Sequence, residues 1–513
     1  MLRQRYQLIV NVLSNYVAIA IFGIVNFVIV GYVVRKLGSE NFGLISLLLS
    51  LIIITDILGK GISQALIKHA SGAISNSDNL EVNQLANACL VWLFTCGLIG
   101  CVILTSIGFY IDRLFEIPPD LVRTARLGMI LIAFLRVLLC FPLDVYTGLL
   151  CAHQRYDLVN IVRSVAIVFR MLAIILYFEF VSPSIIAMII ISVASALFER
   201  LLYITFALRV HKGIRFGLSF LDRSHLYVLI SFGGMMLVIH IANLIGYESL
   251  KWIIGFELNL VDVGGYTLIA ALVMFAGMLV RTISEVLAPV ASRYDALKRP
   301  DKNKELSFVS TKYTMIIASG LCIMPVFLLN PFLRLWAGDG YSSEYLDHLA
   351  INCAVLMLGQ WFISAAVCIL QMLTGLGKIR FPAVVTLLWA IGGVAAVWAY
   401  LHWVNNTLFA VVVGITIARV IGSLAHLIYG IYVLGLSPIN FIAKSIFKPA
   451  LVGLAMCLLS SFFALYINLN KVENFVLAGA ILASGYALAT WAFVLGAEER
   501  SGIIERIRVR IYG

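Results

Sequence analysis

Charged side chains are scarce in this sequence. Only 12% of its 513 residues are Asp, Glu, Lys or Arg, whereas 62% are hydrophobic and the mean hydropathy is +1.01. A soluble domain normally carries about 25% charged residues, so the composition excludes a soluble globular protein. A membrane-spanning helix needs about 20 mainly apolar residues. The chain has enough apolar residues for about fourteen such helices.

Recognisable catalytic and cofactor-binding motifs are also missing. The nine cysteines form no CxxC pair and no Cys/His metal spacing, so we expect small buried hydrophobic residues. Neither GxxxxGK[ST] nor GxGxxG occurs where a strand and a helix would use it. No loop exceeds about 25 residues, which leaves no room for a catalytic domain outside the membrane. We therefore expect no enzyme, no cofactor and no bound metal.

What the sequence does contain is a succession of long apolar segments separated by polar residues. They lie near residues 9–34, 42–61, 85–110, 122–150, 159–179, 184–209, 225–250, 263–287, 307–333, 348–374, 381–403, 407–434, 449–468 and 474–495. We predict an all-α polytopic membrane protein with about fourteen transmembrane helices.

The basic residues indicate how these helices are oriented. With the N-terminus in the cytoplasm, the cytoplasmic segments hold about 23 Lys and Arg and the opposite side about 8. The densest groups are residues 209–215, 293–312 and 500–510. This bias predicts that both termini are cytoplasmic. The net charge of +11 is then mainly a topology signal, and we expect no nucleic-acid partner.

A weak internal repeat divides the chain. Residues 37–44 resemble 261–266, and residues 150–155 resemble 373–378, both at an offset of about 222. This offset covers six helices, an even number, so the two halves have the same orientation, which suits alternating access in a transporter. We predict two pseudo-symmetric six-helix lobes, 1–222 and 223–446, followed by two additional helices and a basic tail, 447–513.

Several arginines lie near the middle of predicted spans, where an ionisable group is costly and is a functional candidate by default. Arg170 and Arg419 have no acidic neighbour on their own helices. The excess of positive charge favours an anionic ligand, and a guanidinium binds phosphate oxygens through two parallel hydrogen bonds. We predict that the anionic head group is bound by Arg136, Arg170, Arg281 and Arg419. Snorkelling or helix bridging remains the structural alternative for each of them.

Acidic residues accompany these arginines. Asp56 with Lys60, and Arg281 with Glu285, have the i,i+4 spacing that allows a structural ion pair. Glu248 is the deepest acidic residue at the outer end of the seventh span. We predict gating or ion-coupling roles for Asp56, Glu248 and Glu285. The adjacent residues Glu199 and Arg200 point about 100° apart on a helix, so we expect them to find partners on other helices.

Short motifs along the chain resemble those of the Wzx-like polysaccharide-biosynthesis flippases, a family of the multidrug/oligosaccharidyl-lipid/polysaccharide (MOP) exporter superfamily. The motifs are Arg35-Lys-Leu-Gly-Ser-Glu-Asn-Phe-Gly43, Gly148-Leu-Leu-Cys-Ala-His-Gln-Arg-Tyr156, Glu248-Ser-Leu-Lys-Trp-Ile-Ile-Gly255, Val263-Gly-Gly-Tyr266, Pro289-Val-Ala-Ser292, Leu335-Trp-Ala-Gly338 and Gly375-Leu-Gly-Lys378. They occur in order between about residues 10 and 445 and so cover most of the chain.

The resemblance implies a V-shaped fold of two helical lobes, like that of other MOP and MATE exporters. It further implies a flippase in the bacterial inner membrane that moves a polyprenyl-pyrophosphate-linked glycan, such as an O-antigen or exopolysaccharide repeat unit, to the outer leaflet. Coupling to an H⁺ or Na⁺ gradient is also implied. Membrane lipids are expected partners, and a glycan polymerase and the chain-length machinery are candidate ones.

Three alternatives stay open from the sequence. A multidrug cation antiporter of the same superfamily would need an acidic, aromatic interior, whereas this interior is basic. A lipid-linked peptidoglycan-precursor flippase shares every physical feature used above. A membrane enzyme, such as a glycan polymerase or polyprenyl-dependent transferase, would need a sizeable surface loop with paired carboxylates.

Overall fold

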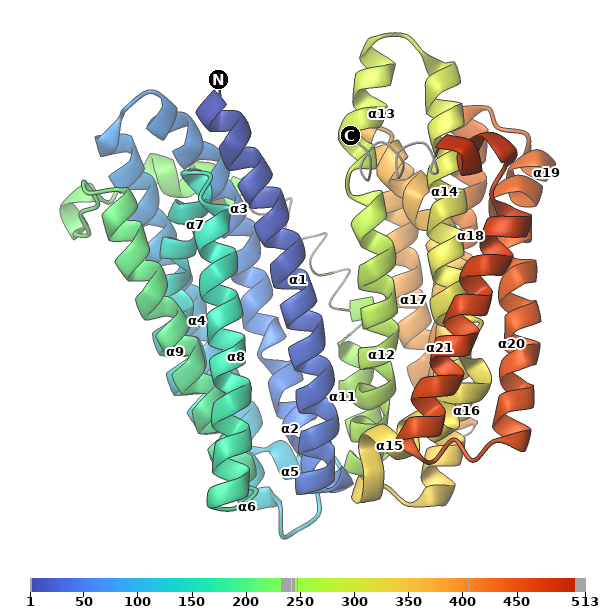
Figure 1. Ribbon diagram of the computed structural model, residues 1–513. Helices are drawn as coiled ribbons and strands as arrows, with labels where there is room; N and C mark the ends of the chain where they lie inside the picture. Colours follow the sequence, from blue (N-terminus) through green and yellow to red (C-terminus); the bar gives the residue numbers. More distant parts are fainter. Residues whose placement is uncertain (1, 232–240, 242–244, 247, 405, 503–513) are drawn as a thin grey trace. The chain divides into compact units, whose positions relative to one another are not determined.

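The computed structural model describes residues 2–231, 241, 245–246, 248–404 and 406–502, with side chains for all of these except 2–9, 12, 13, 54, 57, 58 and 218. All regular secondary structure in this part of the chain is helical (Figure 1). Long apolar segments in a bilayer must satisfy every backbone N–H and C=O internally, and a helix does so within one segment. The predicted all-α class is confirmed.

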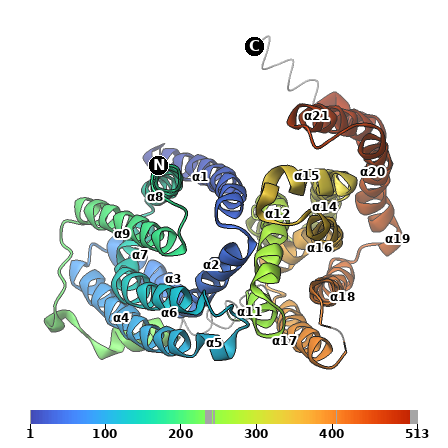
Figure 2. The same ribbon diagram turned by 90° about the horizontal axis from the view of Figure 1, so that it is seen from below.

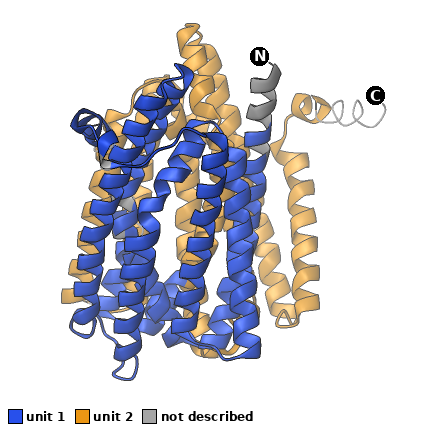
Figure 3. Ribbon diagram, turned by 90° about the vertical axis from the view of Figure 1, so that its left-hand side faces the viewer, with its two compact units in different colours: residues 1–267 blue, residues 268–513 orange. Residues whose placement is uncertain are grey.

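The chain divides into two compact units, Met1–Thr267 and Leu268–Gly513, which Figure 3 distinguishes by colour. The first unit contains α1 (Leu2–Leu37), α2 (Ser39–Leu51), α3 (Ile53–Ser75), α4 (Asn79–Phe109), α5 (Ile111–Leu114), α6 (Val122–Leu131), a π-helical segment (Ile132–Cys140), a 3₁₀ turn (Phe141–Leu143), α7 (Asp144–Ala152), α8 (Tyr156–Phe180), α9 (Ile185–Val210), a 3₁₀ turn (Leu218–Phe220), α11 (Ser249–Glu257) and the start of α12 (Leu260–Ser284).

The second unit continues from α12. It contains α13 (Leu287–Ala296), α14 (Pro300–Cys322), a 3₁₀ turn (Val326–Leu328), α15 (Leu329–Ala337), a 3₁₀ turn (Gly338–Gly340), α16 (Ser343–Gly375), α17 (Arg380–Trp403), α18 (Leu408–Leu434), α19 (Pro438–Phe441), a π-helical segment (Ile442–Phe447), α20 (Lys448–Tyr466), α21 (Val472–Ala489) and a last π-helical segment (Thr490–Val494).

Twelve helices in the described part of the chain are long and apolar enough to cross a membrane, and each matches one of the fourteen predicted segments. Of the other two segments, 42–61 falls on α2 and the first part of α3, which meet at Ile52 rather than forming one continuous helix. Half of 225–250 lies outside the described residues. The lobe boundaries at 222 and 446 were predicted from an internal sequence repeat. The division into two compact units does not test that repeat, so these boundaries stay a prediction.

Helix packing in the first unit forms one bundle. Helix α1 packs against α8, α8 against α9, and α7 against both α3 and α9, while α4 lies against α3 and the π-helical segment (Figure 2). A cluster of buried apolar residues from α3, α4 and α7, including Leu66, Leu93 and Val145, fills the space between them. In the second unit, α16 contacts α14 and α18, α17 packs on α18, and α20 packs on α14 and α21.

The fourth predicted span is not a regular helix. Pro142 has no backbone N–H, and its ring would clash with the carbonyl of the residue four positions earlier in an α-helix. The chain instead passes from α6 through the π-helical segment and the 3₁₀ turn that contains Pro142 before α-helix resumes at Asp144. This widened stretch contains Arg136, one of the predicted ligand-binding residues.

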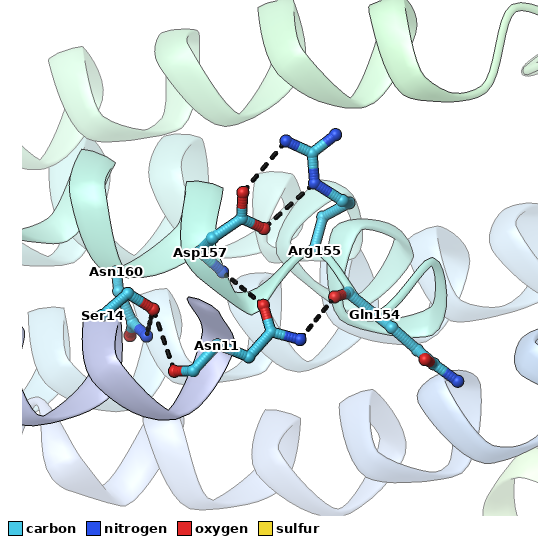
Figure 4. Close-up of polar contacts among 6 residues, drawn as sticks. All are labelled: Asn11, Ser14, Gln154, Arg155, Asp157 and Asn160. Atoms are coloured by element: carbon cyan, nitrogen blue, oxygen red, sulfur yellow. Dashed lines mark hydrogen bonds and ion pairs between the residues drawn. The ribbon is translucent and has the colours of Figure 1, made fainter. Parts of the chain in front are cut away.

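Polar residues tie the start of α8 to α1 (Figure 4). The Asn11 amide donates to the Gln154 carbonyl at 2.8 Å and accepts from the Asp157 backbone N–H at 3.1 Å. The Asn160 amide donates to Ser14 Oγ at 3.0 Å. Polar side chains at helix interfaces hold membrane bundles together where apolar contact gives no net driving force. These bonds fix α8 against α1.

Candidate functional site

The first unit encloses a cavity of about 700 Å³ between α1, α3, the π-helical segment, α7, α8 and α9. All of its lining residues belong to this unit. Its ionisable lining side chains, cysteine and tyrosine aside, are Lys60, Arg136, Arg163, Arg170 and Arg200, together with Asp56, Asp144 and Glu199. Five basic and three acidic groups give the wall a surplus of positive charge.

Two elements supply three further arginines to the cavity wall. Arg136 projects from the π-helical segment, and Arg163 and Arg170 lie seven residues apart on α8, so they share one helix face. In the described part of the chain, none of the three has a carboxylate within ion-pair distance. The Arg163 guanidinium instead lies over the Phe22 ring, 5.5 Å from its centroid.

Arg200 is held differently, because two carboxylates share it. Its guanidinium lies 2.6 Å from Asp144 Oδ1 and 2.9 Å from Glu199 Oε2. The Tyr203 hydroxyl donates to the other Glu199 oxygen at 2.9 Å. The Arg200 side chain is only 9% exposed, so the group is buried on the wall of the cavity. We expected Glu199 and Arg200 to find partners on other helices. Arg200 does pair with Asp144 on α7, but it also pairs directly with Glu199 on its own helix.

Asp56 lies on the α3 side of the cavity with Lys60. The i,i+4 spacing allows these two residues to pair, yet the structure shows no ion pair between them among the described contacts. Asp56 is partly buried, Lys60 is exposed, and both line the cavity. Both remain available to a ligand in the cavity.

The other predicted site residues lie elsewhere. Arg281 and Glu285 are exposed at the end of α12 and beyond it, and they form no ion pair with each other in the described structure. Arg419 is buried on α18, with its guanidinium 5.9 Å from the centroid of the Trp389 ring. Glu248 directly precedes α11 without a side-chain capping hydrogen bond, and its carboxylate pairs with Lys251 at 2.8 Å. The structure thus brings Arg136, Arg170 and Asp56 to one cavity, and the remaining predicted residues do not line it.

Sequence reasoning missed Arg163. It lies in α8, closer to the start of the helix than Arg170 does, and it was not among the predicted site residues. The signal that would have found it is the seven-residue spacing from Arg170, which places two arginines one above the other on the same face. Two buried polar atoms of the wall, Arg200 Nε and Thr147 Oγ1, have no hydrogen-bond partner among the described residues. Such atoms suit a polar ligand or water.

Comparison with known proteins identifies the family. Residues 8–295 match the model of the polysaccharide biosynthesis protein family, which is more than half of the chain. The chain therefore belongs to this family, and it is a multi-pass membrane transporter rather than an enzyme. The predicted Wzx-like, MOP-superfamily resemblance is confirmed.

Two relatives with curated descriptions are similar over most of the chain. A Bacillus subtilis strain 168 protein named "Uncharacterized membrane protein EpsK" is 21% identical over 514 residues, covering 97% of this chain and 98% of the relative. A Shigella flexneri protein named "Putative O-antigen transporter" is 20% identical over 384 residues, covering 74% of this chain and 87% of the relative.

Solved structures show the same fold at low identity. The lipid II flippase MurJ in an inward closed conformation superposes with a TM-score of 0.72 at 12% identity, covering 94% of this chain and 98% of that one. A MATE family multidrug resistance transporter of the MOP superfamily superposes with a TM-score of 0.69 at 15% identity, covering 82% and 95%. The all-helical MATE-like fold that the resemblance implied is confirmed.

Proposed function

We propose that this protein is a flippase that moves a polyprenyl-pyrophosphate-linked oligosaccharide, such as an O-antigen or exopolysaccharide repeat unit, across the bacterial inner membrane. The observation that carries the proposal is the basic cavity of the first unit, where five basic groups face three acidic ones. Family membership supports a polysaccharide cargo, and one relative is named as an O-antigen transporter.

The pyrophosphate is the part of this substrate that the cavity suits. Arg136, Arg163 and Arg170 have no carboxylate at ion-pair distance in the described structure, so their positive charge is available to phosphate oxygens. A guanidinium offers two parallel N–H donors to a phosphate and stays charged when buried. The glycan then crosses in a wet path while the polyprenyl chain remains in lipid. The head group is bound in this account by Arg136 and Arg170, with Arg163 as a third ligand.

The other parts of the prediction belong to the same proposal. Both termini face the cytoplasm, and alternating access moves the head group outward. The driving ion is H⁺ or Na⁺, and Asp56 is the predicted coupling residue that lines the cavity. Head-group binding by Arg281 and Arg419, and gating or ion coupling by Glu248 and Glu285, stay predictions, and these four residues lie outside the cavity. A glycan polymerase and the chain-length machinery are the proposed partners downstream.

A flipping assay in proteoliposomes tests the function. The probe is a polyprenyl-pyrophosphate lipid that carries a fluorescent oligosaccharide, and a membrane-impermeant quencher reports which leaflet holds it. The Arg136→Gln/Arg170→Gln variant is expected to flip at least about tenfold more slowly than the native protein, because each lost charge-assisted hydrogen bond contributes about 1.5–3 kcal/mol. Arg126→Gln, which breaks a pair with Asp112 outside the cavity, is the matched control and is expected to flip normally.

Two results would contradict the proposal. One is native flipping by the double variant at normal protein levels. The other is proton- or sodium-driven efflux of a cationic dye by the native protein with no flipping of the lipid probe, which would favour the multidrug antiporter. A preference for a lipid-linked peptidoglycan precursor over the oligosaccharide lipid would instead move the substrate to that class.

A further inference from the structure

The cavity of the first unit contains a charge arrangement that anion binding alone does not explain. Asp144 and Glu199 both pair with Arg200, at 2.6 Å and 2.9 Å, and the second Glu199 oxygen accepts from Tyr203. Two carboxylates on one guanidinium leave a surplus of one negative charge. This surplus lies on the wall of a cavity that, in the proposed function, binds an anion. We call Asp144, Arg200 and Glu199 the carboxylate triad.

The charged groups around the triad come from three further elements. Asp56 on α3 and Arg136 on the π-helical segment interact electrostatically with Asp144. Arg170 on α8 interacts electrostatically with Glu199. Arg163, also on α8, is close enough to act on the Tyr203 hydroxyl. Lys60 completes the set of charges on the cavity wall. The surplus negative charge is therefore offset by the same arginines that are free to bind phosphate.

An anion that binds Arg136 and Arg170 would neutralise their positive charge, which would then no longer offset the negative charge of the triad. The triad would then keep one negative charge beside a new anion in a buried wall, which is costly at low dielectric. Adding one proton from water to a carboxylate oxygen of Asp144 or Glu199 removes the surplus. Arg200 still keeps one ionised partner in that state. When the anion leaves, the proton returns to water.

We propose that the carboxylate triad links anion binding to the uptake of one proton, so that the site binds its anion more tightly as the pH falls and releases it as the pH rises. This inference rests on the proposed function, because it assumes that the arginines bind the anion. It assigns the proton-coupled role to Asp144 and Glu199 in addition to the predicted Asp56. The coupling is reciprocal. Protonation of the carboxylate raises the affinity for the anion by the same factor by which bound anion raises the carboxylate's affinity for the proton.

The test uses the full chain in lipid nanodiscs and methanedisulfonate as the probe. This dianion has the two-centre shape of pyrophosphate, but its charge stays constant over the pH range used. Calorimetric titrations between about pH 8 and about pH 5.5 are expected to show about tenfold tighter binding at the lower pH, with up to about one proton taken up per probe bound. Buffers of different ionisation enthalpy measure the proton uptake directly.

Asp144→Asn and Glu199→Gln keep the side-chain shapes and remove one negative charge each. The variant of the carboxylate that takes the proton is expected to bind tightly already at the higher pH and to lose the pH dependence. Tyr203→Phe removes the donor to Glu199 and is a second, milder variant that shifts the dependence to higher pH if Glu199 takes the proton. Asp112→Asn, whose carboxylate pairs with Arg126 outside the cavity, is the control and is expected to keep the native pH dependence.

The outcomes distinguish the anion-binding site from its linkage to proton uptake. Binding that disappears in Arg136→Gln/Arg170→Gln but does not vary with pH in the native protein would overturn the proton linkage and leave the anion site standing. A pH dependence unchanged in both carboxylate variants, with thermal shift showing them folded, would also overturn it. If the native protein does not bind the probe at either pH, the anion site itself is wrong and the linkage falls with it.

Discussion

At the residue scale, the buried charges of the first unit are stable only when they are paired with one another. The buried Arg200 side chain pairs with a carboxylate on α7 and with one on its own helix. A buried ion pair adds little net stability, because the attraction mainly offsets the cost of removing both charges from water. Removing one partner has a much larger effect, because the other charge is left buried and uncompensated.

Arg200→Met therefore tests the structural role of the triad. The substitution leaves Asp144 and Glu199 without their shared cation, and we expect the free energy of unfolding in mixed micelles to fall by about 3–5 kcal/mol. Arg126→Met, which breaks the exposed pair with Asp112, is the control and is expected to change stability little. An Arg200→Met protein as stable as the control would show that the triad is not held as described.

Two histidines outside the membrane-spanning segments form a second titratable feature. His153 follows α7 and His211 follows α9, with their ring centroids 5.2 Å apart. Burial lowers the pKa of both imidazoles below the ordinary value of 6.5, and the proximity of His211 lowers the pKa of His153 further. Both Nε2 atoms are buried without a hydrogen-bond partner in the described structure. The folded state therefore favours the neutral pair.

The stability contributed by this pair is expected to depend on pH. Because the folded-state pKa values lie below those of the unfolded chain, the contribution is complete above about pH 6.5. It is lost as the pH falls below that value, since the unfolded chain then binds more protons. Thermal unfolding of the native protein should shift to lower temperature between about pH 7.5 and pH 5.5. The shift should shrink in a His153→Gln/His211→Gln variant, and an unchanged shift would rule out the pair as its source.

At the element scale, close backbone contacts explain why some motif positions are glycine. A Cβ on Gly43, at the start of α2, would overlap the carbonyl oxygen of Leu260 at the start of α12. A Cβ on Gly375, at the end of α16, would overlap the carbonyl oxygen of Ala288 on α13. Small residues let helix backbones approach this closely in membrane proteins.

Gly43→Ala is expected to destabilise the protein by about 1–3 kcal/mol, because the added methyl group forces the two backbones apart. Gly72→Ala is the matched control, since a Cβ there meets nothing within 4 Å in the described structure. Alanine is favoured over glycine in a helix by about 0.5–1 kcal/mol, so the control should be neutral or stabilised. Equal thermal stability of the two variants would contradict the close contact between α2 and α12.

The sequence predicted the elements better than it predicted their details. Twelve apolar segments matched described helices because length and hydropathy alone decide whether a helix can span a bilayer. Length and hydropathy do not predict the π-helical segment around Arg136, although Pro142 shows that a regular α-helix cannot continue there. A break at Ile52, between two apolar residues with no proline or glycine beside them, leaves no local signal in the sequence.

At the scale of the whole molecule, the proposed head-group site belongs to a single unit. Sequence reasoning selected arginines by their depth along a helix, and depth gives no information about which face of the helix they occupy. It therefore grouped Arg136 and Arg170 with Arg281 and Arg419. The structure places the first two on one cavity and the last two in the second unit. The central claim is that the first unit alone provides the binding site for the pyrophosphate.

Photo-cross-linking tests this claim most directly. A polyprenyl-pyrophosphate oligosaccharide with a diazirine on the sugar next to the pyrophosphate is bound to the full chain, irradiated and mapped by mass spectrometry. We predict cross-links within residues 122–210, where the π-helical segment, α7, α8 and α9 line the cavity, and their loss in Arg136→Gln/Arg170→Gln. Cross-links confined to residues 268–513, unchanged in that variant, would contradict the account.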